Sequence, residues 1–170
     1  MTTAEILLQD FDREMSNTRR TLERVPEDKA DYKPHEKSMP MGRLAMHCAT
    51  LPILGVYLME KEALDLADPT RQNPDMTFRS REECLRAFDE SAAKCRAAIA
   101  AANDEQLAKQ WRFSFGEHVI SNDSRSLSFQ RMCLHHLIHH VAQLGVYLRL
   151  NNVAVPALYG PSADEQWPSK

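Results

Sequence analysis

Apolar residues recur at steps of three and four along four long stretches of this 170-residue chain, and the spacing predicts four amphipathic helices. The first stretch opens with Thr2 and Glu5 in capping-box spacing and stops at Pro26. Ser80 and Glu83 repeat the same spacing at the start of the third. The expected helices cover residues 2–25, 41–66, 80–102 and 126–150.

The composition favours an all-α fold. Only 5 residues are Gly, so few tight hairpin turns are expected. Four amphipathic helices pack most naturally as an antiparallel four-helix bundle, and the length suits a single domain over residues 1–170. Residues 111–123, rich in aromatic and β-branched types, are expected to form a covering loop or a short extended segment.

Charge and hydropathy narrow the class of protein. The chain has 21 Lys and Arg against 24 Asp and Glu, which is not the basic balance of a nucleic-acid-binding protein. No apolar run reaches the roughly 18 residues of a membrane span, and the N-terminus turns acidic before a signal-peptide core can form. We expect a cytoplasmic protein with no nucleic-acid or membrane partner and with four reduced cysteines.

Pro52 lies inside the second expected helix. Because Pro has no backbone N–H, the carbonyl of Cys48 loses its helical partner and a kink is expected there. Two interpretations stay open: the kink shapes the surroundings of His47, or it only curves a long helix around the core.

Four of the seven histidines lie in one segment, residues 135–140. They form two pairs at i and i+4, and either pair lies on one helix face and can chelate a metal ion. At about 100° per residue, the His136/His140 pair flanks the apolar stripe of this helix, whereas the His135/His139 pair points to solvent. We therefore favour the first pair as ligands and a solvated, titrating role for the second.

His47, in an otherwise apolar stretch, is the candidate third ligand, and its alternative role is a hydrogen-bonded core histidine. Three histidines without a fourth protein ligand leave a position for water or substrate, as in catalytic sites. Cys48 and Cys133 compete as ligands, but each is rotated away from the nearest proposed histidine and suits a small core position better. No HExxH motif is present, so the general base of a metalloprotease is missing.

At these residues the sequence resembles the DinB/YfiT-like superfamily of four-helix-bundle metalloenzymes. The strongest match is residues 136–149, HLIHHVAQLGVYLR, where Val141 and Ala142 replace the Arg and Gly usual in the family. Residues 25–29, 32–35, 44–47 and 159–165 also resemble the family. The resemblance implies that His47, His136 and His140 bind a divalent metal, zinc or nickel. Gln143, Tyr147 and Arg149 are candidates to support the site, but a Tyr and an Arg near the end of a helix more often pack or meet solvent.

Characterised members of that family include thiol S-transferases that use bacillithiol or mycothiol, and a thiol-dependent isomerase. The resemblance therefore implies an enzyme in which a metal lowers the pKa of a thiol or water for attack on a small electrophile. The expected partners are a small-molecule substrate, with a low-molecular-weight thiol as the candidate, and a second copy of the chain in a homodimer. The alternatives are a non-catalytic metal-binding stress-response protein and a purely structural helical dimer.

Overall fold

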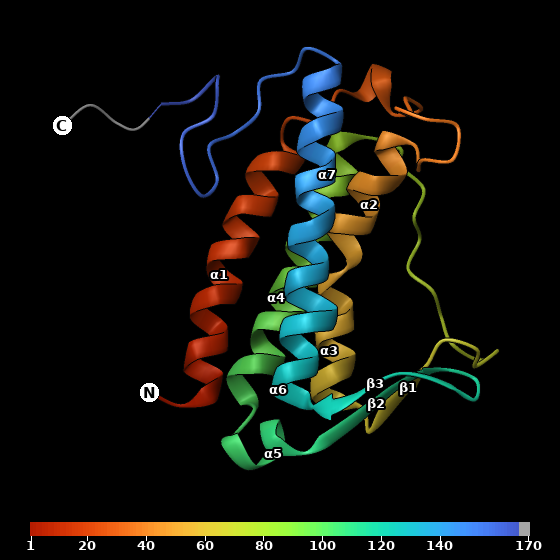
Figure 1. The fold of residues 1–170 in the computed structure, drawn as a ribbon, viewed down its shortest axis with the longest axis vertical. Coiled ribbons are helices and arrows are strands. Elements are labelled where there is room, and N and C mark those ends of the chain that lie inside the picture. Colours follow the sequence, from red (N-terminus) through yellow and green to blue (C-terminus); the bar gives the residue numbers. More distant parts are fainter. Residues whose placement is uncertain (167–170) are drawn as a thin grey trace.

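A computed structural model describes residues 1–166, and the last four residues of the expected domain lie outside the described residues. Four helical columns pack around one apolar core (Figure 1). The columns are α1 (Thr3–Leu22), α2 (Met41–Thr50) continued by α3 (Pro52–Glu60), α4 (Arg81–Ala101), and α6 (Arg125–Ser128) continued through the π-helical segment η2 (Phe129–His135) into α7 (His136–Leu150). Two short elements, the 3-10 turn η1 (Glu27–Lys29) and helix α5 (Asp104–Ala108), complete the helical content of the described residues.

The helix N-termini follow the sequence signals. Thr2 and Glu5 form a reciprocal capping box at α1, as predicted. The Ser80 side chain accepts a hydrogen bond from the Glu83 N–H, which satisfies an otherwise unpaired donor in the first turn of α4. Both caps fix where an amphipathic stretch begins, and from there the apolar residues of each helix face the core.

The connection between α3 and α4 makes part of the bundle parallel, which corrects the antiparallel prediction. The end of α3 lies beside α5, where the Gln106 side chain donates to the Met59 carbonyl. Near the start of α2, Gly42 packs against Phe78, two residues before the cap of α4. Residues 61–80 therefore return along the length of the bundle, and α2–α3 and α4 run in the same direction (Figure 1). Twenty residues of extended chain are ample for this return.

The column that carries His47 is interrupted but not broken. The α-helical pattern stops at Thr50 and resumes at Pro52, while Leu51 between them keeps helical angles, φ −60° and ψ −32°. The column ends at Glu60 rather than at residue 66 as expected. Met41–Glu60 has the length and mean hydropathy (1.2) of a membrane span, but 61% of that window is buried inside the molecule, as in the core helix of a globular protein.

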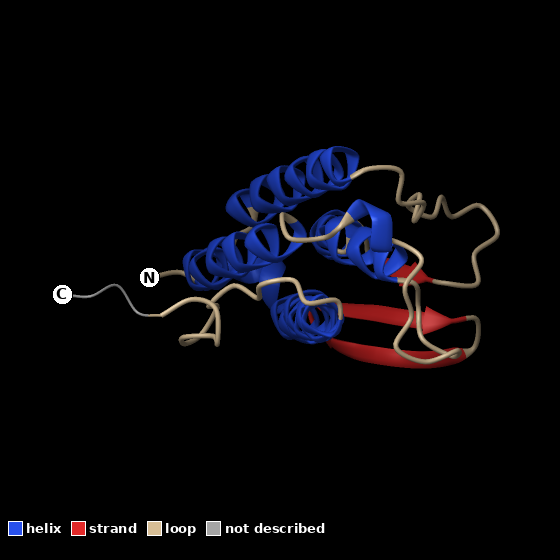
Figure 2. Cartoon of the chain, turned by 90° about the horizontal axis from the view of Figure 1, so that it is seen from above, coloured by secondary structure: helices blue, strands red, loops and turns tan. Residues whose placement is uncertain are grey.

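A three-stranded sheet lies beside the bundle and corrects the all-α prediction (Figure 2). The order is β1-β2-β3: β1 (Ala63–Asp65) pairs parallel with β2 (Gln110–Phe115), which forms an antiparallel hairpin with β3 (His118–Ser124). Gly116 supplies the positive φ (57°) that the hairpin turn requires. The extended segment expected at residues 111–123 is thus a hairpin, and the residues expected to end the second helix form its parallel neighbour.

Candidate metal centre

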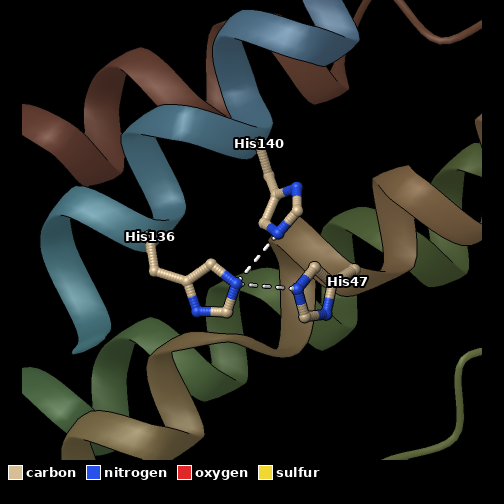
Figure 3. A group of neighbouring side chains, drawn as sticks. All are labelled: His47, His136 and His140. Carbon is tan, nitrogen blue, oxygen red and sulfur yellow. Dashed lines mark hydrogen bonds between the residues drawn. The ribbon is translucent and has the colours of Figure 1, made fainter.

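Three histidines from two helices meet at one point between α2 and α7 (Figure 3). His47 lies on α2, and His136 and His140 lie one turn apart on α7. The Nε2 atom of His136 is 3.4 Å from that of His47 and 2.9 Å from that of His140. One ring nitrogen from each residue falls within 4.8 Å of the other two. The structure therefore brings together the three candidate ligands selected from the sequence.

The other histidines and cysteines of the sequence argument lie elsewhere. His135 and His139 are exposed, as predicted from their position around the helix. Cys48 and Cys133 are fully buried free thiols in the apolar core and are absent from the histidine cluster. Their burial supports the prediction that they are small core residues.

The spacing of the cluster suits a divalent cation. In a tetrahedral site with metal–nitrogen bonds near 2.0–2.1 Å, ligand nitrogens lie about 3.3 Å apart. The 3.4 Å separation of His47 and His136 has this value, and the 2.9 Å separation of His136 and His140 is that of two rings sharing a hydrogen bond. Small changes in χ2 would open the second distance. The three imidazoles thus fit a metal with a free coordination position.

The protonation state of the three rings also suits a cation. Burial, with the charges of His140, His136 and Arg43, lowers the pKa of His47 to about 4. Burial is likewise the largest cause that lowers the pKa of His136 and of His140. Only the neutral imidazole has a lone pair for a metal, so all three rings are in the ligand form at neutral pH.

A cavity of about 530 Å³ opens beside the cluster, with His47 and His136 in its wall. This volume is within the roughly 300–1,000 Å³ of small-molecule sites. Most of the wall is apolar and comes from three parts of the chain: helix α3, the sheet and the connection between α3 and α4. Its apolar side chains include Leu54, Leu64, Leu66, Met76 and Phe113.

The family model of the DinB superfamily matches residues 10–144, which is most of the chain and includes His47, His136 and His140. The chain belongs to the DinB superfamily. No curated protein matches it.

Crystal structures of DinB-like proteins share the fold. One from Bacillus subtilis has a TM-score of 0.67 at 19% identity, over 94% of this chain and 98% of the other. One from Bacillus cereus has a TM-score of 0.65 at 16% identity, over 89% of this chain and 95% of the other. At such identities the likeness concerns the fold alone, and the chemistry of this DinB chain has to be argued from its own residues.

The remaining candidate residues of this DinB chain have three different roles. Gln143 touches the cluster: its Oε1 is 2.8 Å from Nδ1 of His140. Tyr147 does not, because its hydroxyl donates to the carbonyl of Met39 and its ring packs on Tyr32. Arg149 forms an ion pair with Asp164 in the C-terminal segment. Of these three candidates only Gln143 contacts the cluster, whereas Tyr147 packs and Arg149 pairs at the surface, the roles that the sequence favoured for them.

Proposed function

We propose that this DinB superfamily member is a metal-dependent enzyme in which His47, His136 and His140 hold a divalent cation, zinc or nickel, for attack of a thiol or water on a small electrophile. The observation that carries the proposal is the convergence of three neutral imidazoles at the edge of an apolar cavity. When bound, the metal would lower the pKa of a thiol or water beside it.

The chain itself contributes orientation and exclusion of water. Gln143 accepts a hydrogen bond from Nδ1–H of His140, which leaves the Nε2 lone pair of that ring directed at the cluster. The apolar wall beside the rings removes water from an electrophile and strengthens electrostatic interactions at the site.

Metal analysis of untagged protein tests the ligand set. Wild type should bind one ion per chain. His47→Ala should lose the ion, because only the two imidazoles of His136 and His140 would remain in the cluster. The matched control is the double variant His135→Ala, His139→Ala, which removes two exposed imidazoles from the same helix and should keep the ion. An unchanged metal affinity in His47→Ala would contradict the ligand assignment.

Turnover separates the enzyme from the alternative, a non-catalytic metal-binding stress-response protein. The assay mixes bacillithiol, mycothiol or glutathione with monochlorobimane and follows conjugate formation. If the protein is an enzyme, conjugates should form faster than in the uncatalysed reaction. A chelator should abolish this rate enhancement, and added metal should restore it. Stoichiometric metal without turnover of any thiol or of hydrolysable esters would support the non-catalytic alternative.

A further inference from the structure

The cavity beside the histidine cluster contains two arginines and no acidic side chain. Arg43 and Arg71 line it, and no Asp or Glu among residues 1–166 does. This positive charge stands out in a chain whose formal net charge is −3. Charges of one sign in an apolar cleft concentrate ligands of the opposite charge, because the low-dielectric walls focus the field.

Arg71 presents a buried hydrogen-bond donor that nothing in the described structure satisfies. Its Nη2 donates to the side chain of Asn73, but its Nε–H is buried without a partner. The nearby carboxylate of Asp68 accepts from the backbone and hydroxyl of Thr70 instead. Buried donors are almost always paired, so the unpaired donor marks Arg71 as a residue of the cavity wall whose guanidinium is incompletely satisfied.

Arg43 adds charge next to the histidines. It lies four residues before His47 on α2, and residues at i and i+4 share a helix face. Among residues 1–166 it has no carboxylate within ion-pair distance, although most arginines of this chain have one. The side chain is exposed, so its attraction for an anion is long-range and weakened by salt.

We propose that the cavity binds a small organic anion with a carboxylate on an apolar body. The carboxylate pairs with the guanidinium of Arg71, with Arg43 adding electrostatic attraction, and the body lies on the apolar wall of α3 and the sheet. Arg favours a planar carboxylate because its donors are arranged as a fork. The proposal names the substrate class of the proposed enzyme. It rests on the proposed function only for the reactive end of the anion, which would face the histidines.

Calorimetric titration of metal-free protein with 4-phenylbutyrate and with the uncharged 4-phenyl-1-butanol tests the proposal. The two probes share an apolar body and differ in the carboxylate. Wild type should bind the acid at least about tenfold more tightly than the alcohol, as one charged hydrogen bond predicts. Arg71→Met should remove this preference and leave the affinity for the alcohol. Arg43→Met should reduce the preference for the acid at low salt and leave that preference nearly unchanged at high salt.

Two further variants complete the design. Arg112→Met removes the same charge beside Phe113 on β2 but from a residue outside the cavity wall, so it should keep the preference. Arg71→Lys keeps the charge without the fork and should give an intermediate preference for the acid. It replaces Arg71→Met in the test if that variant does not fold. Equal affinities for acid and alcohol in wild type, or no detectable binding of the acid, would overturn the proposal. Because these titrations use metal-free protein, their outcome is independent of whether the histidines bind metal.

Discussion

At the residue scale, a hydrogen bond at Nδ1 of His140 sets how that ring can act as a metal ligand. An imidazole bound to a metal through Nε2 carries its proton on Nδ1, and a fixed acceptor there sets both tautomer and ring orientation. Gln143 is that acceptor for His140, 2.8 Å away and three residues along the same helix. An exposed glutamine thereby gains a role that its exposure alone would not indicate.

Removing the Gln143 acceptor should weaken metal binding without abolishing it. We expect Gln143→Ala to bind metal about 10–100-fold more weakly, the usual effect of deleting a group that orients a ligand. Gln143→Glu keeps an acceptor for the same N–H and should retain wild-type affinity or exceed it. Competition titration with a chromogenic chelator measures both variants. Equal affinities of wild type and Gln143→Ala would show that the hydrogen bond has no part in metal binding.

The lowered pKa of His47 predicts how metal-free stability depends on pH. The folded ring protonates near pH 4, whereas the unfolded ring protonates near its ordinary pKa of 6.5. Between these values the unfolded chain binds the extra proton, so stability is complete above pH 6.5 and falls as the pH drops towards 4. Urea unfolding of metal-free wild type and His47→Asn from pH 8 to 4 should show a steeper loss in wild type. Parallel pH profiles would contradict the assignment.

At the element scale, the helices were predictable because each buries one face. The three-four spacing identified the four columns, and an i,i+4 pair within α7 plus one histidine on α2 identified the cluster. Strand β1 was not predictable: Leu64 and Leu66 continue the apolar pattern of the preceding helix, and their pairing with β2 depends on residues almost fifty positions away. The π-helical segment η2 likewise leaves no mark in the spacing of apolar residues.

The cavity also lacked a local signal. Its wall combines Leu64, Arg71 and Phe113, which belong to three separate segments and meet only because the chain returns along the bundle after α3. The expected helices left only residues 67–79 to join the second helix to the third. With the helix ending at Glu60, the connection is long enough to reverse the direction of α4 and to cover the site.

Helix α3 approaches its neighbours too closely for any side chain at Gly55. A Cβ there would lie 2.4 Å from Sγ of Cys95 on α4 and 2.9 Å from the ring of Phe129. We expect Gly55→Ala to lower the free energy of unfolding by about 1–3 kcal/mol through overpacking, although Ala is the better helix former. Gly145→Ala on α7 is the control, because its Cβ would meet Val155 at an ordinary 3.7 Å. That variant should be neutral or gain up to about 1 kcal/mol. Chemical denaturation measures both, and a stabilised Gly55→Ala would contradict the close packing.

At the scale of the whole molecule, the sheet and the bundle meet at the end of α3. The fully buried Trp111 of β2 donates from Nε1 to the carbonyl of Lys61, at 3.1 Å. Arg125, the first residue of α6, donates to the same carbonyl at 2.8 Å. Since the cavity lies between α3 and the sheet, this junction holds its two walls at their spacing.

Arg125 should therefore be the arginine on which stability depends most. It is 2% exposed and also donates to the carbonyls of Leu58 and Met59, the last turn of α3, where no helical N–H is available. Its ion pair with Glu62, whose side chain is 93% exposed, adds little. Arg125→Met leaves the carbonyl of Leu58 buried without a donor and removes one donor from that of Met59, and we expect a loss of about 3 kcal/mol in the free energy of unfolding.

The control for this prediction is Arg131→Met, which breaks a surface ion pair with Asp123 from a side chain that is 51% exposed and should cost less than about 1 kcal/mol. Urea denaturation compares the two variants at neutral pH. Arg125 contacts none of the three histidines, so the folded fraction of Arg125→Met should keep its metal while its cavity, with the sheet released from α3, binds 4-phenylbutyrate more weakly. Equal losses of stability in the two variants would mean that the sheet is held to the bundle by its apolar contacts alone.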